Sequence, residues 1–113
     1  EAAHVTALTD VVTQLGGTPV AEQAYDFGYT DAASFLQVAQ ALEDTGVAAY
    51  QGAAQYLMDN DDLLTAALTI HGVEARHAAY VAILNGQNPY PDAVNPTLTP
   101  AEVLEIATPF IQM

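Results

Sequence analysis

Two short motifs in the sequence place an imidazole three residues after a carboxylate. Glu74 and His77 form one motif, and Glu1 and His4 repeat the spacing at the start of the chain. A third carboxylate, Glu43, interrupts another apolar stretch. Side chains three residues apart lie on the same face of an α-helix, so each motif presents both groups to one neighbour. Such groups on an apolar face must be paired, hydrogen-bonded or bound to a metal ion.

A Glu-x-x-His motif is short, and a lone copy is more often a satisfied ion pair in a core than a metal site. Glu1, at the first position, could also be solvated. The metal interpretation therefore requires that the predicted helices place the five residues at the same level along the bundle axis.

Apolar residues at helical spacing predict an all-α chain, with three long helices and a short one in a single domain over residues 1–113. Gly16 and Gly17 end the first helix, and a polar turn joins the second and third. The predicted elements are helix 1–15, crossover connection 16–30, helix 31–59, helix 61–86, Pro-rich loop 87–98 and short helix 99–111.

The polar interruptions of the second and third helices fall at matching heights. Glu43 lies about 26 Å before the turn between these helices, and Glu74 and His77 lie about 21 to 25 Å after it, at a rise of about 1.5 Å per residue. An antiparallel hairpin would bring the three side chains together. His4 reaches the same height whether the first helix runs parallel or antiparallel to the second. The length of the 16–30 connection favours a parallel crossover.

Three carboxylates and two imidazoles in one apolar bundle suit a pair of iron or manganese ions. Glu43 and Glu74 would bridge the two ions, and each imidazole would bind one of them. Without metal, like charges would be buried together and at least one carboxyl would have to be protonated. Tyr50, two turns beyond Glu43, is a core aromatic or a redox neighbour of the ions. The predicted metal ligands are Glu1, His4, Glu43, Glu74 and His77.

The residues around these motifs resemble the ferritin-like family that includes desiccation-related and stress-response proteins. The resemblance implies a ferritin-like four-helix bundle with a long crossover, in which the three long helices are the second, third and fourth of the family. The family's first helix, which supplies a further bridging Glu, has no counterpart in these residues. The matching segments are 1–4, 16–20, 25–27, 41–50, 72–77 and 88–93.

The resemblance also implies a partner and a location. Because one face of the bundle would lack its helix, we expect an upstream helix, or another subunit of a homo-oligomer, to cover it. Family members are often exported, so we expect an extracytoplasmic protein, secreted or at the cell surface, whose signal segment lies outside these residues.

The charge balance excludes several classes of partner. The chain has 14 acidic residues against one basic residue, a formal net charge of −13, which repels nucleic acid. The absence of Lys is typical of salt-loving organisms and of acidic exported proteins, and salt should stabilise such a chain. Cys is absent, so disulfides and thiolate sites are excluded. No apolar run approaches the roughly 18 residues of a membrane span.

Two functions remain open at this point. One is a di-metal protein with oxidase, peroxide-consuming or metal-handling chemistry in stress protection. The other is a non-catalytic envelope or extracellular protein that keeps the bundle as a scaffold for assembly. A ferritin-like fold is compatible with both functions. Whether the chain is an enzyme therefore depends on bound metal and on turnover of oxygen or peroxide.

Overall fold

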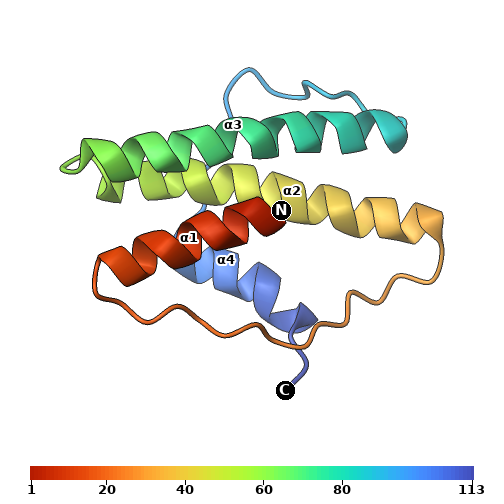
Figure 1. Ribbon diagram of the computed structural model, residues 1–113. Helices are drawn as coiled ribbons and strands as arrows, with labels where there is room; N and C mark the ends of the chain where they lie inside the picture. The colour runs from red at the N-terminus through yellow and green to blue at the C-terminus, as the bar shows by residue number, and fades with distance from the viewer.

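The computed structural model describes residues 1–113 as helices and connections, with no β-sheet, and the predicted all-α class is confirmed. Short 3-10 turns follow the second and fourth helices, and an isolated backbone bridge joins Tyr25 to Ile111. None of the helices has the combined length and apolar character of a membrane span. The α-helices are α1 (Ala2–Gln14), α2 (Ala32–Ala53), α3 (Asp61–Leu84) and α4 (Pro100–Ala107) (Figure 1).

Two helices end earlier than predicted. The helix expected over 31–59 stops at Ala53, because the chain tightens into i→i+3 hydrogen bonds from Leu57 N–H to Ala54 and from Asn60 N–H to Leu57. The helix expected over 99–111 is α-helical only to Ala107, and a 3-10 turn containing Pro109 follows. Proline has no N–H to continue the helical ladder, which accounts for the second difference.

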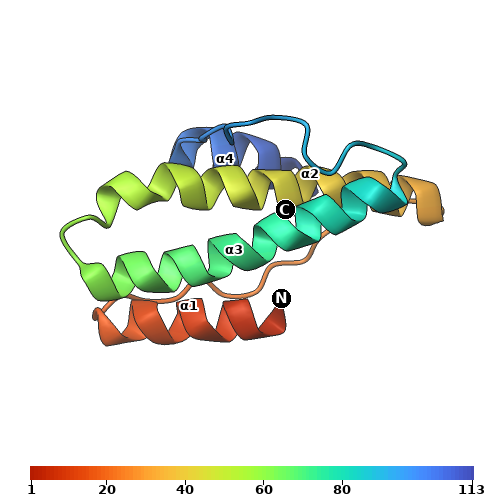
Figure 2. The same ribbon diagram turned by 90° about the horizontal axis from the view of Figure 1, so that it is seen from above.

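The α2–α3 pair is an antiparallel hairpin, and α1 runs in the same direction as α2 (Figures 1 and 2). The connection between α1 and α2 therefore returns along the length of the bundle, as a crossover does. Figure 1 shows α1 and α4 both below the hairpin, and Figure 2 shows α1 on its α3 side and α4 on its α2 side. The side chain of Asp31 caps α2 by accepting from the Ser34 N–H at 2.7 Å, and that of Asn60 caps α3 by accepting from the Leu63 N–H at 3.0 Å.

The core is thin and lies between α2 and α3. α4 packs against α2 rather than against α3. At this side Gly52 allows a close approach, since a Cβ at that position would overlap the carbonyl oxygen of Leu98. The Leu98 N–H also donates to the Ala48 carbonyl at 3.0 Å, so the chain before α4 is fixed on α2. The buried apolar residues are Val47, Ala48, Ile70, Ala78 and Ala82.

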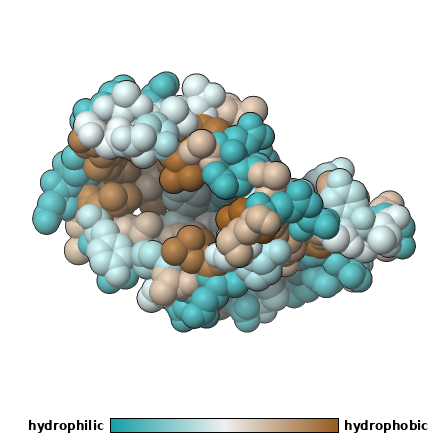
Figure 3. Space-filling model, turned by 90° about the horizontal axis from the view of Figure 1, so that it is seen from below, coloured by the Kyte–Doolittle hydropathy of each residue, from teal (hydrophilic) through white to brown (hydrophobic).

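In contrast, α1 has no buried residue. Its apolar side chains at positions 5, 8, 12 and 15 are exposed, and Val5 and Leu15 keep more than 60% of their surface (65% and 63%). Seen from below, the surface is hollowed and apolar residues line the hollow, on the side where the 16–30 connection runs (Figure 3). The apolar face of α1 thus lacks a partner within the chain.

Candidate metal centre

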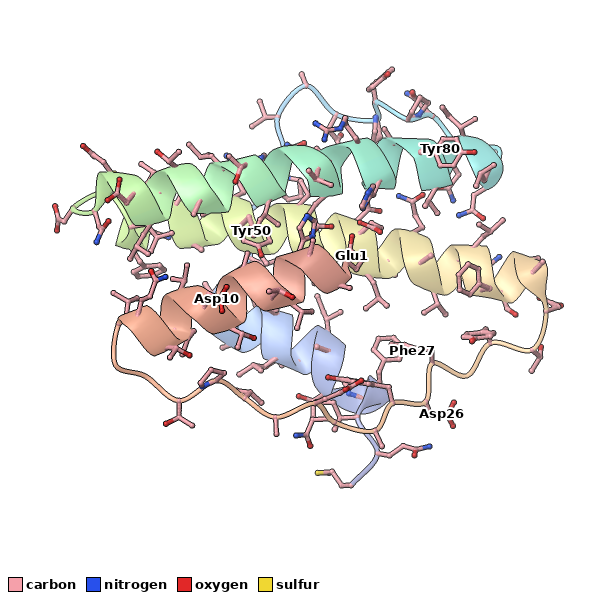
Figure 4. The ribbon with its side chains drawn as sticks, viewed as in Figure 1. Glu1, Asp10, Asp26, Phe27, Tyr50 and Tyr80 are labelled. Atoms are coloured by element: carbon pink, nitrogen blue, oxygen red, sulfur yellow. The ribbon has the colours of Figure 1, made fainter.

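Four of the five predicted ligands converge where the N-terminal end of α1 meets the hairpin. One potential ligand atom from each of Glu1, Glu43, Glu74 and His77 lies within 4.8 Å of the others. Glu1 is the N-cap residue of α1, Glu43 lies midway along α2, and the other two lie one turn apart on α3. Figure 4 shows Glu1 at this junction. The structure therefore places Glu43, Glu74 and His77 at the same level along the hairpin, as their distances from the turn predict.

The imidazole of His77 faces all three carboxylates. Its Nδ1 atom lies 3.0 Å from Glu1 Oε1, 3.5 Å from Glu43 Oε2 and 4.0 Å from Glu74 Oε2. The side chain of His77 is half-buried, and Glu74 is the one charged residue that is buried, at 8% exposure. One nitrogen therefore sits among oxygens that come from three helices.

His4 contacts the same carboxylates from its own side. Its Nδ1 atom lies 3.1 Å from Glu74 Oε1 and 3.2 Å from Glu1 Oε2. The His4 and His77 rings are 6.5 Å apart between centroids. Glu1 and Glu74 thus each present one oxygen to His4 and the other to His77. This division of the oxygens is the geometry that a bridging carboxylate would use.

The cluster is electrostatically costly without a cation. Burial, followed by hydrogen bonding and charge repulsion from Glu74 and the charge of Glu1, raises the pKa of Glu43 to about 8. Burial and the same two carboxylates also raise the pKa of the Tyr50 hydroxyl above its ordinary value. Tyr50 lies on the side of α2 that faces α1 (Figure 4). At neutral pH the metal-free site therefore holds a proton on Glu43.

Two buried atoms of the cluster have no hydrogen-bond partner, namely Glu43 Oε2 and His77 Nδ1. An unsatisfied buried polar atom costs about 1–3 kcal/mol, so native proteins rarely leave one. A direct hydrogen bond joins His4 to Glu1, but no hydrogen bond satisfies Glu43 Oε2 or His77 Nδ1. A cation between them would accept both lone pairs. Oxygen and imidazole nitrogen ligands without thiolate suit iron or manganese, so the residues fit the predicted metal.

Two further features surround the cluster. Gly46, one turn after Glu43, lies beside the Glu74 carboxylate, where a Cβ would stand 3.7 Å from it. A cavity of about 410 Å³ opens onto the three carboxylates, and apolar side chains form most of its walls. The run of aromatic residues in the 16–30 connection was its only signal. The walls include Phe27, Tyr29, Phe35, Val38 and Leu42.

Other polar residues of α3 do not join the cluster. His71 lies one turn before Glu74, and its buried Nε2 atom has no hydrogen-bond partner. Arg76 is exposed and makes no ion pair. His71 is therefore a suitable control for His77, because both are histidines of the same helix.

Comparison with known proteins adds one finding. The sequence model of the ferritin-like domain matches residues 1–87, which contain α1, α2, α3 and all five predicted ligands. No curated protein matches the chain. The match covers more than three quarters of the 113 residues.

Proposed function

Because the chain belongs to the ferritin-like domain family, we propose that it uses its Glu/His cluster to bind a pair of iron or manganese ions. Glu43 and Glu74 would hold the ions between them, His4 and His77 would each bind one, and Glu1 would complete the set. The observation that carries this proposal is the convergence of the Glu1, Glu43 and Glu74 carboxylates on His77, where Glu43 Oε2 and His77 Nδ1 have no hydrogen-bond partner. Glu74 also offers one oxygen toward each imidazole, so both histidines can take part.

The redox chemistry comes from the metal, since bound iron or manganese can exchange electrons with dioxygen or peroxide. The residues of the chain hold and orient it. Glu43 also exchanges a proton, because the proton held at neutral pH must leave when the carboxylate becomes a ligand. We therefore propose oxidase, peroxide-consuming or metal-handling chemistry in stress protection. The aromatic and aliphatic walls of the adjacent cavity would limit water around the ions.

We also propose that the open face is covered in the assembled protein, by another helix of the same polypeptide or by another subunit. The exposed apolar face of α1 and the cavity beside the carboxylates both support this. Sedimentation of the chain at rising concentration would test it, with association expected. Export from the cytoplasm stays a prediction from the family resemblance.

Elemental analysis of natively purified protein is the direct test. We expect about two iron or manganese ions per chain, and loss of most of this metal from His77→Asn. His71→Asn is the matched control, because it makes the same change six residues earlier on α3 and outside the cluster. Its metal content should equal that of the unchanged protein.

Turnover then separates the two functions left open by the sequence. A metal-loaded protein that consumes oxygen or peroxide is an enzyme or a metal-handling protein. Protein that purifies without metal and binds neither ion on titration would overturn the proposal. That result would leave the scaffold function as the better explanation.

A further inference from the structure

A second cavity lies outside the metal centre, between the α2–α3 hairpin and the loop that follows α3. Its volume is about 520 Å³, within the range of about 300–1,000 Å³ found for small-molecule sites. None of its lining residues belongs to the metal cluster. The loop arches over α3 before it returns to α2 (Figures 1 and 2).

Backbone hydrogen bonds at both ends and a high proline content fix the shape of this loop. The Gln87 N–H donates to the Ala82 carbonyl at 2.8 Å, and the Leu98 N–H donates to the Ala48 carbonyl at 3.0 Å. Three of the loop's lining residues are prolines, which fix φ and stiffen the backbone between these anchors. The facing surface of α3 is built of alanines, which are too short to fill the space. These prolines and alanines are Pro89, Pro91, Pro96, Ala75, Ala78, Ala79 and Ala82.

The polar side chains of the cavity are amides, carboxylates and the Tyr90 hydroxyl, with no Lys, Arg or His among them. Gln40 donates from Nε2 to both Asp44 oxygens at 3.0 Å, which orients the carboxylate. The exposed Gln87 and Asn95 side chains also line the cavity, so their amide groups are accessible to a ligand. Donors and acceptors are thus both available beside the alanines of α3.

We propose that this cavity binds a neutral, polyhydroxylated ligand of monosaccharide or disaccharide size. A hydroxyl both donates and accepts, so it can use the amide N–H groups of Gln87 and Asn95 together with the Asp44 carboxylate. The C–H face of a sugar ring can lie on the alanines, and Tyr90, which is 78% exposed at the cavity, offers an aromatic face.

The lining disfavours charged ligands. An anion would meet two carboxylates, Asp44 and Asp92, and no cation. An organic ammonium ion could pair with the carboxylates and donate to the amide oxygens, but it would leave the amide N–H groups to water, whereas a hydroxyl uses both. The choice between a polyol and a cation can therefore be tested by removing amides and charges separately.

The test is an NMR titration of the full chain with maltose, followed at the methyl groups of Ala78, Ala79 and Ala82. We expect saturable shifts at these methyls, in the presence or absence of added iron, with a dissociation constant in the millimolar range. Gln87→Leu should weaken binding at least tenfold. Gln14→Leu, the same change at an exposed position of α1, should leave it unchanged.

Asp44→Asn separates the two ligand classes. Because an amide still accepts from a hydroxyl, maltose binding should fall less than in Gln87→Leu. Putrescine serves as the cationic probe, and its binding should show no preference for the cavity. No saturable maltose shift, equal binding by Gln87→Leu and Gln14→Leu, or putrescine shifts at the same methyls that Asp44→Asn abolishes would overturn the proposal. Asn95→Leu repeats the test if Gln87→Leu fails to fold.

Discussion

The hairpin and α1 are held in place by different forces. α2 and α3 are joined by buried Val47, Ala48, Ile70, Ala78 and Ala82, and α4 adds a further layer on α2. α1 buries no residue and meets the rest of the chain at one end, through the contacts of its first turn with the cluster on α3. Packing stabilises the first region, whereas polar contacts position the second.

This difference connects the metal to the fold. Apolar burial contributes about 25 cal/mol per Å² whether or not a ligand is bound, so the hairpin is insensitive to the site. The contacts of α1 run through Glu1, His4, Glu74 and His77, and a bound cation would hold these four side chains together. The order of α1 should therefore report the state of the metal centre.

The largest expected effect comes from Glu74→Ala, which breaks the polar attachment of α1. Both imidazoles lose a carboxylate partner, so metal affinity should fall more than about 100-fold, beyond the usual cost of losing an outer-shell group. Hydrogen exchange should show α1 amides unprotected while those of α3 stay protected. Glu105→Ala, an exposed acid of α4, is the control. Equal protection of α1 in both variants would show that α1 does not depend on the cluster.

A second pair of variants addresses the packed region. Gly52→Ala should destabilise the fold by about 1–3 kcal/mol, because its Cβ would overlap the Leu98 carbonyl. Gly72→Ala should stabilise it by about 0.5–1 kcal/mol, since that Cβ would enter open space within a helix. Urea unfolding measures the change in the free energy of unfolding for both variants. Their metal content should equal that of the unchanged protein. A common sign for the two variants would contradict the close approach at Gly52.

The smallest expected effect is a pH dependence of the metal-free protein, because solvent reaches the half-buried Glu43 and screens its interactions. The pKa of Glu43 is about 8 in the folded chain, against an ordinary value of 4.5. The folded state therefore binds this proton more tightly than the unfolded state does. The resulting stabilisation is complete below pH 4.5 and is lost as the pH rises through 8. Chelator-treated protein should melt at lower temperature as pH rises across this window. Glu43→Gln should flatten the dependence, and an unchanged slope in this variant would assign it to other groups.

Regular elements explain why much of the site could be predicted. The rise of an α-helix is constant, so distances from the turn are enough to place Glu43 level with Glu74 and His77 along the hairpin. The hydrophobic stripes also indicated which faces meet. The same arithmetic left the direction of α1 open, because His4 reaches that height either way. The length of the connection favoured the crossover that the structure contains.

Irregular segments explain what could not be predicted. The periodic pattern continued past Ala53, but local i→i+3 hydrogen bonds ended α2 there. At Gly52 the close neighbour is the backbone of Leu98, which ends the irregular loop. The cavity under the Pro-rich loop depends on where the loop leaves α3, and loops have no period from which that could be derived.

The parallel crossover has a consequence for the order in which the chain is made. α1 leaves the ribosome before α2 and α3, and His4 must wait for Glu74, which is synthesised 70 residues later. At about 5–20 residues per second, this delay is about 4 to 14 s. During that time α1 lacks its polar contacts with α3, whereas α2 and α3 can pair as soon as both have emerged. A chaperone that shields short amphipathic segments would therefore act on α1 before it acts on the hairpin.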